Sequence, residues 1–377
     1  MEYSVMEQYW IWLSSIEGIG PRRFYQLLSL YSDAREIWEN IRDPKLKFIG
    51  SKAHSALRAA RDERYFYQLF AKLETTGVRA VTRVSDDYPG RLTRTVDAPP
   101  TLYVKGDADL NAERPFAIVG SRRCTRDGLR AAREFAEKLS REGVTVISGL
   151  AAGIDSAAHT GAVNAKAPTI AVLGCGPDIV YPQENLRLYG EILDNGGAIV
   201  SEYLPGMPPL AANFPARNRI ISGMSRGVLI VEGAKRSGAM ITVDFANEQG
   251  RDVFAVPGSI YSPLSATPNQ LIVDGAVPAI SAWEILEYYR WAERPSENAV
   301  RHAAAELSAD EETLVTPLRE QSLTMSELCN MTGFSAQQAN SLLTILELRG
   351  IIEKQPGGEY RAFISNVRTS GSSDLPL

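Results

Sequence analysis

Basic side chains are concentrated in one stretch of the sequence, NFPARNRIISGMSRGVLIVEGAKRSGAM, which runs from Asn213 to Met240. Up to Gly238 its one acidic residue is Glu232, although the whole chain carries a net charge of -5. Guanidinium groups at this spacing can bind successive phosphates, and the aromatic rings of Phe214 and Tyr203 can stack against bases. The stretch therefore favours a single-stranded nucleic acid over a duplex groove; the alternative is a solvated basic surface paired with neighbouring acids. Its basic residues are Arg217, Arg219, Arg226, Lys235 and Arg236.

Three turns rich in glycine, serine and alanine follow short apolar runs. They are GSRRCT (residues 120–125), SGLAAGID (148–155) and GCGPD (174–178). Small residues let backbone N–H groups approach an anion at the start of a helix; the alternative is glycines that serve packing alone. We expect these turns and the basic stretch to form one phosphate-binding site. Its predicted residues are Gly120, Ser121, Arg122, Arg123, Gly149, Gly153, Gly174, Gly176, Phe214, Arg217, Asn218, Arg219, Lys235, Ser237 and Gly238.

Residues that could support catalysis are fewer. Asp155 and His159 lie four residues apart, which suits either an acid–base pair or a buried polar contact. Cys175 has no base near it in the sequence, and no serine motif of the G-x-S-x-G type completes a triad. The glycine-rich turns have neither the G-x-G-x-x-G nor the Walker spacing. The three histidines and three cysteines are scattered without zinc spacing. We therefore expect a protein that is not an enzyme and that holds no metal and no cofactor.

The elements that must position these residues alternate along the chain. Six short apolar runs, FAIVG, VTVISG, TIAVLG, GAIVSE, GVLIVEG and DVFAVPG, alternate with helical patterns such as RDGLRAAREFAEKLS. Near-continuous apolar strands separated by helices predict a Rossmann-like, doubly wound and mostly parallel α/β sheet. Ligands of such sheets bind beyond the carboxyl ends of the strands, where the glycine-rich turns and the basic stretch would meet.

Further domains are expected on both sides of this sheet. The first segment has apolar residues at helical spacing, and IEGIGPRRFYQLL is typical of a helix-hairpin-helix that binds phosphate, or of a simple turn between two helices. The C-terminal order of three helices and a hairpin, with Pro356, Gly357 and Gly358 in the turn, predicts a winged helix. We expect a helical (SAM/helix-hairpin-helix-like) domain over 1–95, the Rossmann-like domain over 96–288, a linker over 289–308, the winged helix over 309–365 and a disordered tail over 366–377.

The predicted winged helix is acidic, because residues 310–361 carry more Asp and Glu than Lys and Arg. The predicted recognition helix, the last of the three helices, would expose Gln337, Gln338, Asn340 and Thr344, with no base before Arg349. Phosphate neutralisation supplies most of the affinity for DNA, so a protein-contact or regulatory role is favoured over duplex reading.

The composition sets outer bounds. A length of 377 residues predicts two or three domains, and 44% apolar with 23% charged residues is typical of a folded globular protein. No run is long and apolar enough for a membrane helix, and the N-terminal MEYSVMEQYWIWL lacks the bases of a signal peptide. We expect a cytoplasmic protein without a membrane partner.

Several long motifs occur in a characteristic order: VGSRRCTRDG, SGLAAGIDSAAH, VLGCGPDIVYPQEN, SEYLPG, NFPARNRIISGMS and KRSGAMITVDFANEQGRDVFAVPG. Over about residues 99–285 they closely resemble the DNA-processing protein DprA (Smf) family. The resemblance implies a non-enzymatic protein that binds and protects single-stranded DNA and loads the RecA recombinase onto it during natural transformation. It also implies a homodimer formed through the Rossmann-like domain, and a single-strand-binding protein is a further expected partner. By motif, the family's pocket falls on Gly120, Ser121, Arg122, Phe214, Arg217, Asn218, Arg219, Lys235 and Ser237.

One stretch departs from the family pattern, and two other functions remain open. In ATPNQLIVDGA, Thr267 and Pro268 stand where the family usually has Gly-Thr or Gly-Cys before Asn. A nucleotide-processing enzyme of the phosphoribohydrolase type is disfavoured, since VEGAKRSGAMIT stands where those enzymes have Pro-Gly-Gly-x-Gly-Thr-x-x-Glu. A sensor of a small nucleotide ligand that signals through the winged helix also fits the predicted fold.

Overall fold

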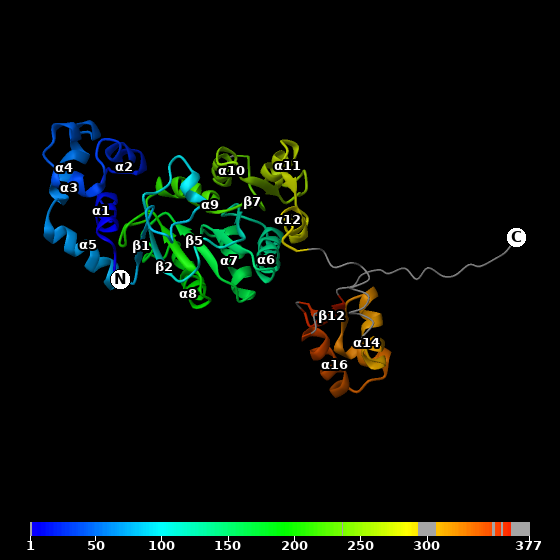
Figure 1. Ribbon diagram of the computed structural model, residues 1–377. Coiled ribbons are helices and arrows are strands. Elements are labelled where there is room, and N and C mark those ends of the chain that lie inside the picture. The colour runs from blue at the N-terminus through cyan, green and yellow to red at the C-terminus, as the bar shows by residue number, and fades with distance from the viewer. Residues whose placement is uncertain (1, 236, 293–306, 349–350, 356, 363–377) are drawn as a thin grey trace. The chain divides into compact units, whose positions relative to one another are not determined.

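The computed structural model describes residues 2–235, 237–292, 307–348, 351–355 and 357–362. The chain divides into two compact units, Met1–Glu293 and Arg294–Leu377, whose helices and strands are labelled in Figure 1. Most of the predicted linker, the whole predicted tail, Arg236, Arg349 and Pro356 lie outside the described residues.

The first unit is built on a nine-stranded sheet of order β1-β2-β6-β5-β4-β3-β7-β8-β9. Neighbouring strands from β6 to β8 are all parallel, as the apolar runs predicted. The prediction of a doubly wound, mostly parallel sheet is confirmed. These six strands are β3 (Pro115–Val119), β4 (Thr145–Ser148), β5 (Thr169–Leu173), β6 (Ala198–Ser201), β7 (Gly227–Ile230) and β8 (Asp252–Ala255).

Three further strands extend the sheet at its edges. β1 (Arg79–Thr82) and β2 (Thr101–Gly106) are antiparallel, and β9 (Val277–Pro278) runs parallel to β8. The sequence patterns did not reveal them. β1, with the sequence RAVT, lacks the near-continuous apolar run of the central strands, and the two-residue β9 is too short to show a strand period. The proline in β9 is tolerated because this strand lies at the edge of the sheet. The segment before residue 95, predicted to be helical, thus contributes a strand to the sheet.

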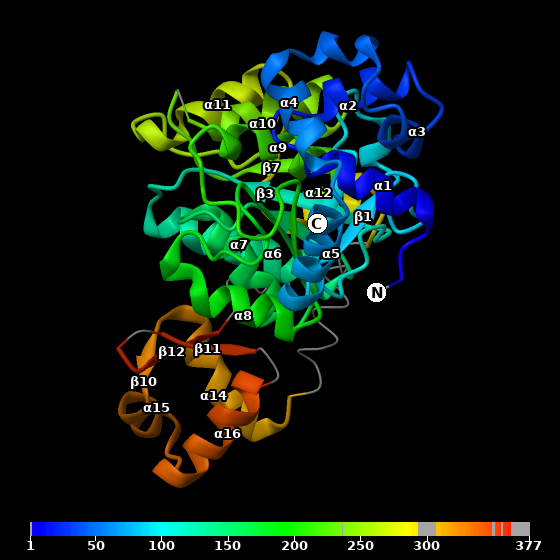
Figure 2. The ribbon, with the colours of Figure 1, turned by 90° about the vertical axis from the view of Figure 1, so that its left-hand side faces the viewer.

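Helices cover both faces of this sheet. In Figure 2, α9, α10 and α11 lie on one side of β3 and β7, and α6, α7 and α8 lie on the other. This two-sided cover explains why the central strands are apolar along their whole length. The helices are α6 (Arg126–Arg141), α7 (Ile154–Asn164), η3 (Gln183–Asn185), α8 (Leu186–Asp194), α9 (Asn213–Met224), α10 (Ala239–Glu248), η4 (Pro263–Ser265), α11 (Ala266–Val273) and α12 (Ala282–Tyr288).

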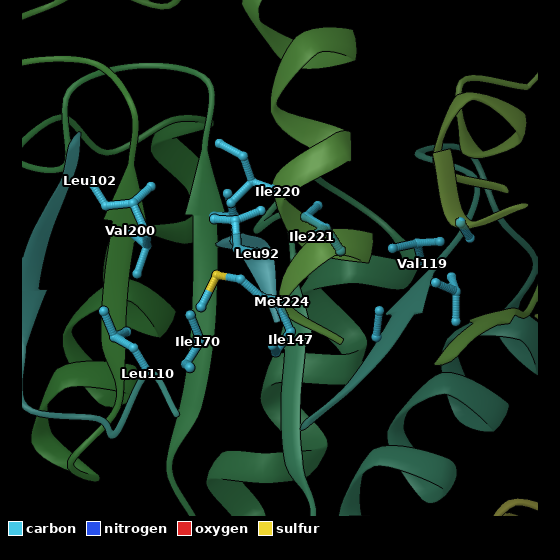
Figure 3. Packing of buried hydrophobic residues seen from close by; sticks show 14 of the residues in the cluster. Leu92, Leu102, Leu110, Val119, Ile147, Ile170, Val200, Ile220, Ile221 and Met224 are labelled. Carbon is cyan, nitrogen blue, oxygen red and sulfur yellow. The ribbon is translucent and has the colours of Figure 1, made fainter. Parts of the chain in front are cut away.

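Alternate residues of each strand enter separate cores. Figure 3 shows the core beneath α9, where Ile220, Ile221 and Met224 pack over side chains such as Val119 and Ile147. On the opposite face, Phe116 and Ile118 of the same β3 pack against α6 and α7. Because both faces of β3 are buried, the helices on the two sides of the sheet are held against this strand. The residues at the two ends of β3 therefore have fixed positions relative to these helices.

The N-terminal helices form a third core, which meets the sheet through β1 and β2. Trp12 and Phe24 lie in this core together with Tyr103 of β2. α2 begins at Pro21 with Gly20 as its N-cap, as predicted for the IEGIGPRR stretch. The elements are α1 (Val5–Ser14), α2 (Pro21–Leu28), α3 (Ala34–Glu39), η1 (Pro44–Ile49), α4 (Ser51–Ala60), α5 (Glu63–Thr76) and η2 (Leu92–Arg94).

The second unit has the predicted order of three helices and a hairpin. Its small sheet has the order β10-β12-β11, and its core includes Leu314, Leu328, Leu343 and Tyr360. The prediction of a winged helix is confirmed. The elements are α14 (Ala309–Glu320), β10 (Leu323–Thr324), α15 (Met325–Thr332), α16 (Ala336–Leu348), β11 (Ile352–Lys354) and β12 (Glu359–Ala362).

We predict that Phe116→Ala lowers the free energy of unfolding of the first unit by about 3–5 kcal/mol, because the ring is fully buried against Phe254 and Trp291. Urea unfolding followed by tryptophan fluorescence measures this unit alone, since no tryptophan follows residue 291. Val96→Ala is the control, because Val96 is fully exposed and its change should stay within about 0.5 kcal/mol. Equal losses in both variants would contradict the placement of this core.

Candidate functional site

The carboxyl ends of β3 and β7 mark the point where the winding of the sheet reverses. From β3 the chain moves outward through β4, β5 and β6, then returns to pair β7 with the other side of β3. A pocket of about 580 Å³ lies at this point, as expected for a doubly wound sheet. We call it the switch-point pocket. It includes the predicted residues Gly120, Ser121, Arg122, Arg123, Phe214, Arg217, Asn218, Ser237 and Gly238.

Arg217 of α9 forms the buried wall of the switch-point pocket. Its side chain is 3% exposed, and its Nη1 donates hydrogen bonds to the backbone carbonyls of Gly149 (2.6 Å) and Val172. Its Nη2 lies 3.8 Å from Oδ2 of Asp155 on α7. Burial lowers the pKa of Arg217 to about 10, which leaves the guanidinium charged at neutral pH. One fixed positive charge therefore joins α9, α7 and the ends of β4 and β5.

The carboxyl of Asp155 accepts hydrogen bonds from the turns that follow β3 and β4. Its carboxyl faces Arg217 and the backbone amides of Ala151, Gly120 and Gly149. Burial raises the pKa of Asp155, and the guanidinium and these amides oppose the rise. The residue thus fixes the pocket wall and is not a free acid or base.

The mouth of the switch-point pocket is aromatic and basic. The guanidinium carbon of Arg122 lies 5.3 Å from the ring centroid of Phe214, and the centroid of the Tyr181 ring lies 5.2 Å from that of Phe214. Arg122 and Arg123 are exposed, whereas Phe214 is partly buried. Tyr181 was missed in the sequence analysis, although its YPQEN motif supported the family resemblance. The mouth offers a cation and two rings to one ligand.

The turn after β3 is held by β7. Ser121 N donates to the carbonyl of Glu232 at 2.8 Å, and the Glu232 carboxylate accepts from the backbone N and Oγ1 of Thr125. Thr125 is also the N-cap of α6. Glu232, the acid of the basic stretch, therefore positions the turn that presents Arg122 and Arg123.

Two predicted glycines permit the close packing behind the switch-point pocket. A Cβ atom at Gly149 would collide with the Arg217 guanidinium. Gly153 has φ of +87°, and a Cβ there would lie 2.5 Å from the Ser121 carbonyl oxygen. These glycines belong to the wall and do not line the pocket themselves.

Four other predicted residues lie outside the pocket lining. Arg219 is 6% exposed and pairs with both carboxylate oxygens of Glu202 (2.8 and 2.7 Å) and with Asp97 (2.9 Å). The prediction that Arg217 and Arg219 follow successive phosphates does not fit this geometry, because both guanidinium groups are buried and bound. Gly174 packs against Phe214, Gly176 donates its N–H to the Met207 carbonyl, and Lys235 is exposed on the turn after β7.

The residues considered for catalysis are poorly suited to it. Burial, and secondly Arg217, lowers the pKa of His159 to about 3, and its Nδ1 lies 2.9 Å from Thr169 Oγ1. Burial raises the pKa of Cys175 to about 11, so its thiol is protonated at neutral pH. Asp155 and His159 fit the alternative of buried polar contacts. Among the described residues, no group of three or more His, Cys, Asp or Glu side chains could hold a metal ion.

Comparisons with known proteins identify the family of the chain. Residues 79–290 match the family model described as DNA recombination-mediator protein A, and residues 298–358 match the DprA winged helix domain. The chain belongs to the DNA-processing protein A (DprA/Smf) family. Protein Smf of Escherichia coli (strain K12) is 39% identical over 300 residues, which cover 77% of this chain and 79% of that protein. The resemblance inferred from the motifs is confirmed.

Two solved structures of DprA proteins are similar to this chain. The X-ray structure of the Streptococcus pneumoniae protein matches with a TM-score of 0.62 at 35% identity, covering 76% of this chain and 98% of that one. The Helicobacter pylori protein, whose structure addresses a unique single-stranded DNA binding mode, matches with a TM-score of 0.51 at 27% identity. That match covers 56% of this chain and 95% of the other.

The departure from the DprA motif has a structural role here. Thr267 Oγ1 donates to the carbonyl of Ala234 at 2.7 Å, and Thr267 N donates to the carbonyl of Gly233. Pro268 lies in the first turn of α11, where a backbone N–H has no partner within the helix. Thr267 therefore holds the turn after β7 that lines the pocket, and Pro268 is accommodated in α11. Within the described part of this DprA chain, no helix has the length and apolar character needed to cross a membrane.

We predict that His159 makes the stability of this DprA protein depend on pH. The unfolded chain binds a proton on this ring below about pH 6.5, whereas the folded chain does so only near pH 3. The contribution of His159 to the free energy of unfolding is therefore fully present above about pH 6.5. It decreases as the pH falls, by about 2 kcal/mol at pH 5. Urea unfolding of the parent and of His159→Gln, measured from pH 7 to 5, isolates the contribution. Parallel pH curves for the two proteins would contradict it.

Proposed function

We propose that this chain binds single-stranded DNA in the switch-point pocket. Backbone phosphates would bind the exposed guanidinium groups of Arg122 and Arg123, which the turn after β3 presents at the pocket. A base would stack on Phe214, next to Tyr181. Arg217 would make the electrostatic potential at the pocket wall positive while it keeps its hydrogen bonds to the carbonyls of Gly149 and Val172. No metal, cofactor or covalent step takes part.

One observation carries this proposal: Arg122 lies over the Phe214 ring at the mouth of a pocket formed by glycine-rich turns. A single strand exposes both its phosphates, which bind a cation, and its bases, which stack on a flat ring. Arg122 and Phe214 provide these two partners side by side. The single-stranded DNA binding mode described for the Helicobacter pylori relative supports the same class of ligand.

The functions proposed beyond DNA binding are argued from the family of the chain and from this binding. We propose that the chain protects incoming single strands and loads RecA onto them during natural transformation and recombination. A homodimer through the Rossmann-like domain and contact with a single-strand-binding protein belong to the same proposal. The winged helix exposes Gln337, Gln338, Asn340 and Thr344 on α16 without a nearby described base, which supports a protein-contact role for this unit.

A free nucleotide is the second candidate ligand. A volume of about 580 Å³ falls in the range of small-molecule sites, and the same guanidinium groups and rings suit one nucleotide. The two candidates differ in length dependence, because a strand gains contacts as it is extended whereas a mononucleotide saturates the pocket at once.

We predict that Arg122→Ala and Phe214→Ala each weaken binding of a labelled oligo-dT by about tenfold, because one removes a phosphate contact and the other a stacking face. Fluorescence anisotropy over a salt series measures both effects, and Arg122→Ala should also reduce the salt slope by about 0.7. Matched controls are Arg35→Ala and Tyr67→Ala, which remove an exposed, ion-paired arginine of α3 and an exposed ring of α5.

Parent-like binding by both pocket variants, or equal affinity for a duplex of the same length, would contradict the proposal. Saturation of the parent by a mononucleotide at the affinity of the oligonucleotide would favour the second candidate. RecA loading is then tested with the same proteins on strands coated with single-strand-binding protein. Arg122→Ala should fail to accelerate RecA filament formation where Arg35→Ala succeeds.

A further inference from the structure

Arginine side chains also gather at the opposite ends of the same two strands. A second pocket of about 370 Å³ is lined by Pro115 at the start of β3 and by Arg226 directly before β7. Arg91 and Arg94 line it from the η2 segment. We call it the arginine pocket. Because Val119 at the other end of β3 lines the switch-point pocket, about 13 Å of strand separates Pro115 in one site from Val119 in the other.

The guanidinium groups of the arginine pocket are not neutralised by the protein. Arg226 Nε donates to the backbone carbonyl of Glu113 at 3.1 Å, which leaves the Glu113 carboxylate unused in this contact. Behind the pocket, Arg251 Nη2 donates to the carbonyls of Arg91 (3.0 Å) and Gly223 (2.9 Å). Within the described part of the chain, no ion pair joins an acidic side chain to any of these four arginines, which are Arg91, Arg94, Arg226 and Arg251.

The four charges also repel one another. Burial, and then Arg226, Arg251 and Arg94, lowers the pKa of Arg91, and burial with Arg94 lowers that of Arg251. The Nε of Arg251 is buried and has no hydrogen-bond partner among the described residues. Concentrated, uncompensated charge of this kind costs stability in the free protein, and an anion would relieve it.

The backbone around the arginine pocket is fixed. Asn111, one of its lining residues, accepts a hydrogen bond from Gly90 N at 2.8 Å and donates to the carbonyls of Asp87 and Tyr88. Arg91 follows directly, with its own carbonyl held by Arg251. The arginines of η2 and of the β7 start are therefore presented by an ordered frame, and little order has to be gained on binding.

We propose that the arginine pocket binds adjacent phosphate groups, at a second site that is separate from the switch-point pocket. The planar forks of Arg91, Arg94 and Arg226 come from two segments and can each hold phosphate oxygens in pairs. The phosphates can belong to a nucleic-acid strand that continues beyond the first pocket, or to a free polyphosphate. The site is argued from its own charges and does not depend on what the switch-point pocket binds.

The test compares the full-length parent with Arg91→Ala/Arg94→Ala. Within the described residues these two side chains donate no hydrogen bond, so the variant should fold and unfold thermally no earlier than the parent. With an oligo-dT of about 30 nucleotides, the variant should lose about tenfold in affinity and about 1.4 in salt slope, as expected for two lost contacts to a single strand. An oligonucleotide of about 6 nucleotides should bind both proteins equally if it occupies the switch-point pocket alone.

A second arm uses sodium tripolyphosphate without DNA and follows the thermal unfolding midpoint. The matched control is Arg35→Ala/Arg141→Ala, which removes two exposed, ion-paired arginines and the same charge. Loss of long-strand affinity in the pocket variant identifies a strand as the ligand, and loss of stabilisation by tripolyphosphate identifies a free polyphosphate. Parent-like behaviour in both arms, or the same losses in the control, would overturn the site. Failure of the 6-nucleotide probe to bind the parent would affect the first pocket only.

Discussion

The buried guanidinium of Arg217 is the interaction on which the rest of the site depends. A charge with 3% exposure is costly unless it is fully paired, and this one is held by two strand-end carbonyls and by the Asp155 carboxylate. Its contacts reach the ends of β4 and β5 and the start of α7. α9 is thereby fixed at one rotation, which places Phe214 and Asn218 at the pocket.

Several local features follow from this constraint. Gly149 must lack a side chain because the guanidinium occupies that space, and Gly153 lets the turn after β3 approach α7. Glu232 then fixes the same turn from the β7 side, so that Ser121, Arg122 and Arg123 form a rigid rim. The chain uses arginine in two ways within one site: buried guanidinium groups hold the elements together, and exposed ones remain available to a ligand.

Much of the architecture could be predicted from the sequence, because burial on both faces leaves a continuous apolar run in each central strand. The pocket position also followed, since parallel strands bring their carboxyl ends to one edge. The role of each arginine could not be predicted from the sequence. Arg219 is neutralised by Asp97 and Glu202, which are distant in sequence, so local charge alone suggested a free cation. Tyr181 reaches Phe214 only through the fold, and the two-residue strand β9 is too short to carry a pattern.

The two ends of the central strands have different electrostatic character. The carboxyl end combines exposed arginines, a paired buried arginine and the ring of Phe214, whereas the amino end gathers Arg91, Arg94 and Arg226 in a smaller pocket whose described lining has no aromatic ring. The first arrangement suits a ligand with bases as well as phosphates, and the second suits phosphates alone.

The most direct test of the central claim is ultraviolet cross-linking of oligo-dT to the unmodified protein, with the linked peptides mapped by mass spectrometry. Our account predicts cross-links on the peptides that contain Phe214 and Tyr181, since these rings are the stacking faces at the switch-point pocket. Cross-links confined to the winged helix or to the N-terminal helices, with none on these two peptides, would contradict it.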